Sequence, residues 1–305
     1  MLCHDLRVDD AGTSLTPLAG GWSGRTFLGE AGGERVVVRL YPPDDARGPE
    51  AAEVDQAVLR LVRGLLPVPD VVEVRRPVPD IGQPGLLVTQ WLPGERGDVV
   101  VRELEDADDA DGLRRLGGSM GTIAATLAGM PVRRTGTFVD AELTLGALPD
   151  LGLAEWVATR LAAWSAMERG ALEEVARDAQ DLLDTVDRAC LVHSDLNPKN
   201  VLVDRDSLEV TAVLDWEFAH AGHPWTDVGN LVRLERHPAW VEGVLATWTS
   251  LRGGTVDGLL DGARSADLWA LVDLAARAGD NPVADRAAVL LRAVADSGDV
   301  HAWPF

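Results

Sequence analysis

A polar octapeptide next to two apolar runs constrains the fold of this chain more than any other feature. The segment His193–Asn200 is followed by the apolar run Val201–Val203, and a second apolar run, Val210–Leu214, leads directly into Asp215–Glu217. Two short β-branched runs separated by polar turn residues predict a β-hairpin. The sequence therefore predicts one hairpin with a polar loop before it and an acidic turn after it.

Three side chains around this hairpin have the order and spacing of a phosphoryl-transfer site. Asp195 is followed five residues later by Asn200, and Asp215 comes after the hairpin. An aspartate in the position of Asp195 can take a hydroxyl proton, while Asn200 and Asp215 can hold magnesium through oxygen atoms. Each residue alone would also suit a turn. Their order, spacing and flanking strands together favour Asp195 as catalytic base and Asn200 with Asp215 as metal ligands.

Two further residues near the octapeptide have roles that we expect to be structural. His193 ends an apolar run, so we expect a buried histidine that fixes the loop by hydrogen bonds. Asp227 lies in the segment Pro224–Gly229. It suits a brace for the same loop, or an acidic residue at the start of a helix.

The first 90 residues predict a small sheet with one prominent helix. Apolar residues recur at helical spacing over 50–63. The expected strands are the β-branched runs 35–41, 71–74 and 86–89. The glycine-rich stretch 20–25 reads as a turn between strands, and a bare stretch of this kind also fits an ordinary hairpin.

The remainder of the chain predicts mainly helices. Pro93 and Gly94 indicate a connector over 91–98. Helical composition is found over 111–129, 151–165, 168–188, 224–235, 238–251, 257–278 and 282–296. We therefore predict an N-terminal lobe over 1–90 and a helical lobe over 99–305, with the catalytic and metal-binding hairpin at 191–217. We expect the acidic run from Glu103 to Asp111 to be a solvated face or loop.

Charge and cysteine content exclude several classes of protein. The 28 basic and 49 acidic residues give a net charge of −21. This disfavours nucleic-acid binding, which depends on Lys and Arg, and it suits a cationic substrate or simply solubility. Cys3 and Cys190 have no neighbours at metal-ligand spacing, so we expect reduced thiols in a cytoplasmic protein. No apolar stretch is long enough for a membrane span.

The chain resembles the aminoglycoside phosphotransferase superfamily, which is related to choline kinases and protein kinases. The resemblance extends over nearly the whole length, and the segments 193–200 and 215–217 carry it most specifically. The Pro67-Val68-Pro69 segment after the predicted helix is typical of antibiotic-kinase-like members. The resemblance implies an α+β, two-lobed protein-kinase-like fold, with a small, mainly β N-lobe, a larger helical C-lobe, and ATP and Mg²⁺ bound in the cleft.

The resemblance also implies roles for residues outside the hairpin. The loop with Gly21, Ser23 and Gly24 would cover the phosphates through backbone N–H groups. Arg39 stands where kinases typically place a phosphate-binding lysine, and it keeps the charge with a different geometry. Glu53 is its expected partner, with Glu50 and Asp55 as alternatives that spacing leaves open. The expected nucleotide-binding residues are Gly21, Ser23, Gly24, Arg39, Glu53, Gln90, Trp91, Leu92 and Lys199, of which Gln90, Trp91 and Leu92 would contact adenine.

The role of Lys199, the only lysine in the chain, stays open. It fits a position near the γ-phosphate, where its charge would stabilise the transition state, and it fits a solvent-facing loop equally well.

These observations predict an ATP-dependent O-phosphotransferase that acts on a small cationic acceptor, with an antibiotic as the leading choice. One alternative is a metabolic kinase that acts on an amino alcohol, a sugar or a nucleoside-like compound. The arginine in place of lysine at position 39 leaves a second alternative, a non-catalytic nucleotide-binding module. A protein kinase is disfavoured because no Ala-Pro-Glu segment follows Asp215. We expect neither nucleic-acid nor membrane partners, and the sequence does not indicate an oligomeric state.

Overall fold

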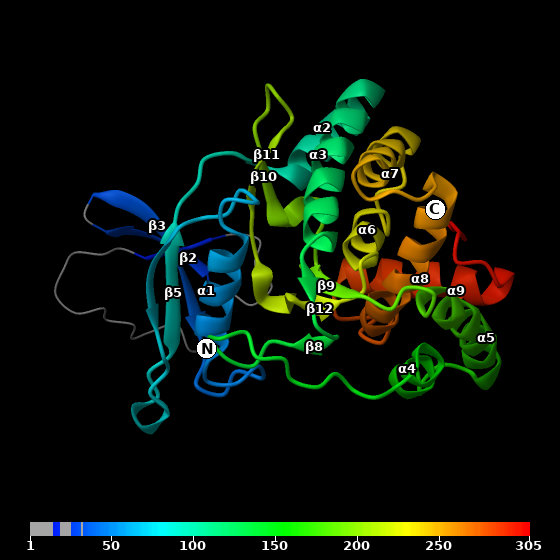
Figure 1. The fold of residues 1–305 in the computed structure, drawn as a ribbon, viewed down its shortest axis with the longest axis horizontal. Coiled ribbons are helices and arrows are strands. Elements are labelled where there is room, and N and C mark those ends of the chain that lie inside the picture. Colours follow the sequence, from blue (N-terminus) through cyan, green and yellow to red (C-terminus); the bar gives the residue numbers. More distant parts are fainter. Residues whose placement is uncertain (1–14, 19–25, 32) are drawn as a thin grey trace. The chain divides into compact units, whose positions relative to one another are not determined.

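The computed structural model describes residues 15–18, 26–31 and 33–305 (Figure 1). The predicted phosphate-covering residues Gly21, Ser23 and Gly24 lie outside this described part. The chain divides into two compact units. Unit 1 comprises residues 1–93 with 139–144, and unit 2 comprises residues 94–138 with 145–305.

Unit 1 is a five-stranded antiparallel sheet with one long helix. The strand order is β1-β2-β3-β5-β4. The strands are β1 (Thr16–Pro17), β2 (Thr26–Ala31), β3 (Glu34–Tyr41), β4 (Val71–Arg75) and β5 (Gly85–Gln90). Val36 and Val38 alternate along β3 and bury one face against Val88 of β5, as a half-buried strand requires. The predicted strands of the N-terminal region are confirmed.

Helix α1 (Ala51–Val62) covers this sheet and packs on β4 and β5. Its buried face is formed by Val54, Val58 and Val62, which recur at helical spacing. The predicted helix is therefore confirmed. A single 3₁₀ turn, η1 (Pro79–Ile81), lies between β4 and β5.

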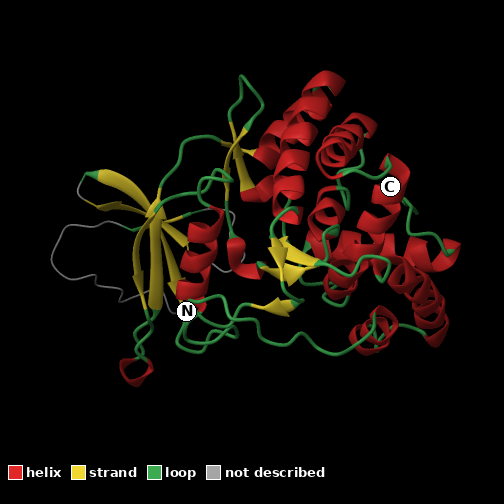
Figure 2. Cartoon of the chain, in the orientation of Figure 1, coloured by secondary structure: helices red, strands yellow, loops and turns green. Residues whose placement is uncertain are grey.

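Unit 2 consists mainly of helices (Figure 2). They are α2 (Gly97–Asp106), α3 (Ala110–Ala128), α4 (Leu153–Arg160), α5 (Ala166–Leu183), α6 (Thr226–Leu231), α7 (Pro238–Arg252), α8 (Val256–Ala275) and α9 (Pro282–Ser297). Helices α3 and α7 lie side by side (Figure 1). A Cβ on Gly121 would lie 2.6 Å from the Val244 carbonyl oxygen, and one on Gly243 would lie 2.2 Å from that of Arg114. Glycine at these positions lets the two backbones approach.

The largest core of unit 2 lies among α4, α5, α8 and α9. Its buried members include Leu153, Leu271 and Leu291. Helix α5 begins with a capping box, in which Ser165 and Glu168 satisfy each other's backbone N–H groups. In the described part of the chain, no helix is both long and apolar enough to cross a membrane.

Two small antiparallel sheets in unit 2 hold the segments that flank the octapeptide. One has the order β11-β10-β6, with β6 (Glu95–Arg96), β10 (Val201–Val203) and β11 (Val210–Val213). The other has the order β7-β9-β12-β8, with β7 (Pro131–Val132), β8 (Gly136–Thr137), β9 (Ala189–Val192) and β12 (His220–Gly222). The 3₁₀ turns η2 (Pro198–Asn200) and η3 (Trp216–Phe218) lie at the two ends of the hairpin. The predicted hairpin is confirmed.

Helix α2 was not predicted as a separate element. Apart from Gly97, its buried residues are Val100 and Val101, and its second half is acidic. The run Glu103–Asp111 thus begins as the solvated face of α2, continues through a turn and ends in the first turn of α3.

Candidate active site

The hairpin brings the two predicted metal ligands to the same end of unit 2. In its register Val201 pairs with Val213, and the Leu214 N–H donates to the Asn200 carbonyl oxygen at 2.8 Å. Asp215 follows directly and adopts a left-handed backbone conformation, with φ of +63°. This conformation ends the strand, so Asp215 begins the turn while Asn200 stays buried at the start of β10.

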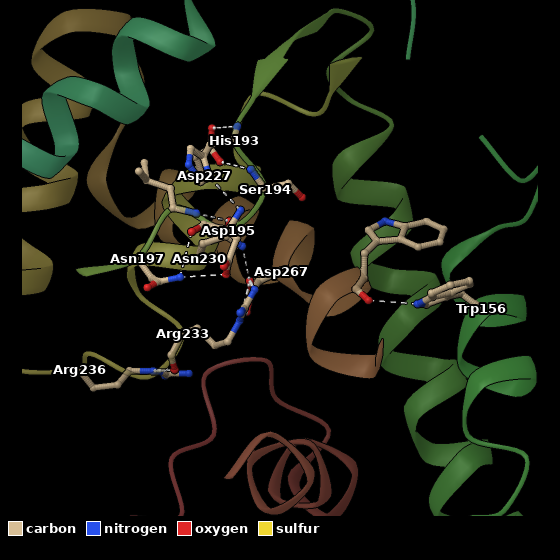
Figure 3. Close-up of polar contacts among 12 residues, drawn as sticks. Trp156, His193, Ser194, Asp195, Asn197, Asp227, Asn230, Arg233, Arg236 and Asp267 are labelled. Carbon is tan, nitrogen blue, oxygen red and sulfur yellow. Dashed lines mark hydrogen bonds and ion pairs between the residues drawn. The ribbon is translucent and has the colours of Figure 1, made fainter. Parts of the chain in front are cut away.

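Two asparagine amides, those of Asn197 and Asn200, hold the Asp195 carboxylate, and Figure 3 shows the contact from Asn197. Asn197 Nδ2 donates to Asp195 Oδ1 at 2.8 Å, and Asn200 Nδ2 donates to Asp195 Oδ2 at 2.7 Å. Both amides also donate to the Asp195 carbonyl oxygen at 2.9 Å. Each carboxylate oxygen has two lone pairs. Each therefore keeps capacity to accept a further hydrogen bond, such as one from a hydroxyl group.

The donor set fits a magnesium ion better than a transition metal. Because Asn200 points its amide nitrogen at Asp195, its Oδ1 is turned away from that carboxylate. Among the described residues, no three His, Cys, Asp or Glu side chains converge on a metal position. One carboxylate and one amide oxygen, completed by phosphate oxygens and water, is a set that magnesium uses. Asn200 Oδ1 and the Asp215 carboxylate are the two groups that would hold it.

His193 joins the octapeptide to the end of the hairpin. Its ring is fully buried, its Nε2 lies 2.8 Å from the Leu214 carbonyl oxygen, and its Nδ1 accepts the Asp195 N–H at 3.3 Å. Since Nδ1 accepts, the ring proton is on Nε2, which donates to Leu214. The ring also packs on Trp216, with centroids 4.7 Å apart. The expected loop-fixing role is confirmed, and it positions Asp195 relative to Asp215.

Asp227 anchors the loop from α6. Its carboxylate accepts the N–H groups of His193 at 3.0 Å and of Ser194 at 2.8 Å. Ser194 has a φ of +66°, so these bonds hold a backbone conformation that is rare outside glycine. Burial raises the pKa of the Asp227 carboxyl above its ordinary value, against the lowering effect of His193 and the two N–H groups. Asp227 therefore braces the loop that carries Asp195, as predicted.

A second buried layer supports the loop one turn further along α6. Asn230 Oδ1 accepts the Leu196 N–H at 3.3 Å, and Asn230 Nδ2 donates to Asp267 of α8 at 3.2 Å. Asp267 also accepts from Arg233 Nε at 2.8 Å and from the Arg233 terminal nitrogen at 2.6 Å. The sequence analysis did not predict that Asn197, Asn230, Arg233 and Asp267 support the Asp195 loop. Only Asn197 had a signal, because it lies inside the octapeptide.

Lys199 lies in η2, on the same short loop as Asn200. Its backbone N–H donates to Asn197 Oδ1 at 3.0 Å, and its side chain is partly exposed. Within the described residues, no hydrogen bond or ion pair engages its ammonium group. Both predicted roles of Lys199 therefore remain open.

In unit 1, the three acidic candidates for pairing with Arg39 are engaged differently, and Glu50 lies 3.5 Å from a terminal nitrogen of Arg76. Asp55 is buried and accepts from Tyr41 Oη and from Arg47, both at 2.7 Å. Glu53 bonds Arg76 Nε at 2.5 Å through Oε1, while its Oε2 is buried without a hydrogen-bond partner in the described structure. The Arg39 guanidinium lies over the Tyr41 ring, 5.7 Å from the centroid. The pairing of Arg39 with Glu53 stays a prediction.

The predicted adenine-contacting segment begins at Gln90, the last residue of β5 in unit 1. The Gln90 N–H donates to Asp70 at 2.8 Å, and the Trp91 N–H donates to Arg35 at 3.4 Å. The Trp91 ring carries the Arg35 guanidinium 5.1 Å from its centroid. Leu92 is half-buried, and its N–H bonds no other described residue. Of these three N–H groups, that of Leu92 is the one available to a nucleotide base.

Comparison with solved structures defines the class of fold. The GDP complex of aminoglycoside 2'-phosphotransferase-IIIa aligns with a TM-score of 0.68 at 17% identity, covering 94% of this chain and 93% of that chain. A thermostable mutant of aminoglycoside phosphotransferase APH(4)-Ia, in a ternary complex with ADP and hygromycin B, aligns with a TM-score of 0.64 at 17% identity, over 93% and 94%. The chain thus has the two-lobed α+β fold of the kinase-like phosphotransferases, as predicted.

The sequence identifies the family within this class. The profile of the Phosphotransferase enzyme family matches residues 14–269, so the chain belongs to that family. The prediction that it is a phosphotransferase is confirmed. Acyl-CoA dehydrogenase family member 11 of Mus musculus is 40% identical over 52 residues. Those residues are 17% of this chain and 7% of that protein, so the chain spans only a small part of this curated relative.

Proposed function

We propose that this protein transfers the γ-phosphoryl group of ATP to a hydroxyl group of a small molecule. The observation that carries the proposal is the Asp195 carboxylate, which two amides fix in place while each oxygen keeps accepting capacity. One of those amides belongs to Asn200, so the same contact orients the base and a magnesium ligand. Nucleotide complexes of proteins with this fold support a nucleotide as donor.

In the proposed reaction, Asp195 accepts a hydrogen bond from the acceptor hydroxyl and orients it toward the γ-phosphorus. A bond forms between the acceptor oxygen and the γ-phosphorus as the bond to the β–γ bridging oxygen breaks. The hydroxyl proton passes to the Asp195 carboxylate, and ADP leaves. His193 and Asp227 keep the loop backbone in place during these steps.

We assign the metal to Asn200 Oδ1 and the Asp215 carboxylate. A magnesium ion held there would neutralise charge on the transferring phosphates. For the nucleotide, we assign residues 1–90 as the nucleotide-binding lobe, with Arg39 on the phosphates and Glu53 as its partner. Gly21, Ser23 and Gly24 would cover the phosphates, the Leu92 N–H with Gln90 and Trp91 would contact the base, and Lys199 would lie near the γ-phosphate. Residues 91–98 would connect to the acceptor lobe at 99–305.

We propose a cationic antibiotic as the acceptor class. Two observations support it: the net charge of −21, and the hygromycin B bound in a structure with this fold. A cytoplasmic location follows from the proposed use of ATP. It also fits Cys190, a buried free cysteine whose pKa burial raises to about 12.

The test is a turnover screen of the purified protein with ATP and Mg²⁺ against aminoglycosides, macrolides, peptide antibiotics and amino alcohols. We expect ADP release that depends on one group of acceptors, with mass spectrometry showing a phosphoryl group on the product. Turnover of amino alcohols alone would replace the antibiotic assignment with a metabolic one. Tight ATP binding without transfer to any acceptor would contradict the proposal and favour a non-catalytic module.

A further inference from the structure

A buried ion pair lies one layer behind the Asp195 loop. Asp267 of α8 accepts from Arg233 Nε at 2.8 Å and from a terminal nitrogen of Arg233 at 2.6 Å. The side chains of Arg233 and Asp267 are only 10% and 6% exposed. Burial would lower the pKa of Arg233, but the charge and hydrogen bonds of Asp267 outweigh it, so this pKa is raised. The two groups therefore form one coupled unit that is largely removed from water.

Stability is a weak reason for placing this ion pair in the interior. Taking two charges out of water costs much of what their attraction returns, and apolar residues of similar size are often at least as stabilising. Asp267 has a further contact that indicates another role. Its Oδ1 accepts a hydrogen bond from Asn230 Nδ2 of α6 at 3.2 Å (Figure 3).

The Asn230 amide bonds in two directions. The residue is buried, its Nδ2 donates to Asp267, and its Oδ1 accepts the Leu196 N–H at 3.3 Å. Rotation of the amide by half a turn would exchange its oxygen and its NH₂ group. An NH₂ group would then face the Leu196 N–H, and a hydrogen bond could not form. The orientation of the Asn230 amide therefore decides whether this side chain holds the loop.

Asp267 selects the orientation that holds the loop. A carboxylate only accepts hydrogen bonds, so the amide nitrogen of Asn230 is the end that can face it. Arg233 fixes the position of this carboxylate through Nε and a terminal nitrogen. Helices α6 and α8 also approach closely here. A Cβ on Gly229 would lie 2.4 Å from the Ala263 carbonyl oxygen and 2.9 Å from Asp267 Cβ. Glycine beside Asn230 thus allows the contact to form.

We propose that Asp267 is a positioning residue for the proposed base, Asp195. It turns the Asn230 amide so that its oxygen holds the Leu196 N–H, and Leu196 directly follows Asp195 in the chain. Asp227 holds the N–H groups of the two residues before Asp195. The backbone is therefore anchored on both sides of the base. The assignment of Asp195 as base rests on the proposed function, whereas the contact with Leu196 does not.

A swap of the polar groups between α6 and α8 tests this role. Asn230→Asp places a second carboxylate against Asp267, with no hydrogen atom between them. We expect their repulsion to displace the loop and to lower kcat by about 10- to 100-fold, while the KM for ATP keeps its wild-type value. Asn230→Asp combined with Asp267→Asn restores one donor and one acceptor at the same total charge. This combined variant should recover about tenfold in kcat.

The matched control is Asp273→Asn. Asp273 lies on the same helix as Asp267 and is also paired with an arginine, Arg277. It contacts α4 through Arg160 rather than the Asp195 loop. We expect this variant to keep the kcat of the wild type.

A second measurement does not depend on turnover. Hydrogen exchange of the Leu196 N–H is followed by NMR in protein that contains isotope-labelled leucine. Asn230→Asp should speed this exchange by about five- to tenfold. The combined variant should return it toward the wild-type rate, and Asp273→Asn should leave it unchanged.

A combined variant no more active than Asn230→Asp, with both folded by circular dichroism, would overturn the proposal. So would a wild-type exchange rate at Leu196 in Asn230→Asp. If Asn230→Asp alone does not fold, a combined variant that folds and keeps wild-type exchange at Leu196 supports the proposal, and faster exchange contradicts it. If the wild-type protein turns over no acceptor, the proposed function fails, and exchange at Leu196 alone decides whether Asp267 positions the loop.

Discussion

The Asp195 loop of unit 2 and the strand–helix pair of unit 1 are held by different kinds of contact. Around Asp195, the supporting side chains are mostly buried, and they bond backbone or one another: His193, Asp227 and Asn230 each hold the loop. In unit 1, Glu53 instead pairs with Arg76, whose side chain is 59% exposed, and its second oxygen is left buried without a partner.

This difference indicates that the contacts around Asp195 form before any ligand binds, whereas the ion pair of Glu53 can rearrange. Breaking a buried network leaves unsatisfied groups behind, so the Asp195 loop keeps its geometry without a ligand. An ion pair with an exposed arginine contributes little and is easily exchanged. We infer that the base is fixed by the fold, whereas the phosphate-binding ion pair forms when the nucleotide arrives.

The largest effect on stability is expected from Asp227→Ala. Two buried N–H groups, those of His193 and Ser194, would lose their acceptors, at about 1–3 kcal/mol each. We expect a loss of roughly 2–6 kcal/mol in the free energy of unfolding, measured by urea denaturation, and a fall in kcat of about a hundredfold. Asp227→Asn keeps one acceptor oxygen and should lose less of both. Equal losses in the two variants would show that these two hydrogen bonds do not account for the loss of stability and activity.

Arg39→Ala tests the phosphate side of the comparison. Loss of a charge-assisted contact costs about 1.5–3 kcal/mol. We therefore expect the KM for ATP to rise by about 10- to 100-fold, with little change in the urea midpoint. Arg39→Lys restores the charge and should recover much of the affinity. An unchanged KM in Arg39→Ala would place this arginine outside the nucleotide site.

The stability of unit 2 should depend on pH through His223. Burial lowers the pKa of His223 to about 4, from an ordinary value of 6.5. Because the folded state binds this proton less readily, the unfolded state gains protons first as pH falls. Stability present above pH 6.5 should be lost down to pH 4, by about 1–3 kcal/mol. His223→Gln should flatten this profile in part, since burial also lowers the pKa of His220. If the stability of His223→Gln depended on pH as steeply as that of the wild type, the loss of stability could not be assigned to His223.

The smallest effect is expected from Arg76→Ala. This change removes the exposed partner of Glu53 and frees its carboxylate for Arg39. We expect a KM for ATP that is about two- to fivefold lower than in the wild type, with the same kcat. Arg75→Ala, which removes the exposed partner of Glu73, is the control and should change neither. A KM that rises in Arg76→Ala would mean that Glu53 is not the partner of Arg39.

Local sequence patterns predicted most helices and strands. The features that they did not predict depend on packing between elements that are distant in the sequence. The alternation in β3 and the spacing in α1 are dictated by one buried face, so periodicity revealed both. Helix α2 has too few buried apolar residues for the same signal. His193 and Asp227 were predictable because each lies beside a motif residue or in a distinctive turn. Asp267 was not, because its role depends on α8 packing against α6, 37 residues from Asn230 in sequence.

The central claim is that Asp195 is the base and is preset by the fold. The most direct test is Asp195→Asn, assayed for kcat by ADP release and for affinity by calorimetry with a non-hydrolysable ATP analogue. Asp206→Asn, on the exposed turn of the same hairpin, is the control. We predict that kcat falls by about 10²- to 10⁴-fold in Asp195→Asn alone, while nucleotide affinity changes far less and stability falls by no more than the loss of one of the two amide contacts, about 1–3 kcal/mol. A kcat close to that of the wild type would contradict this account.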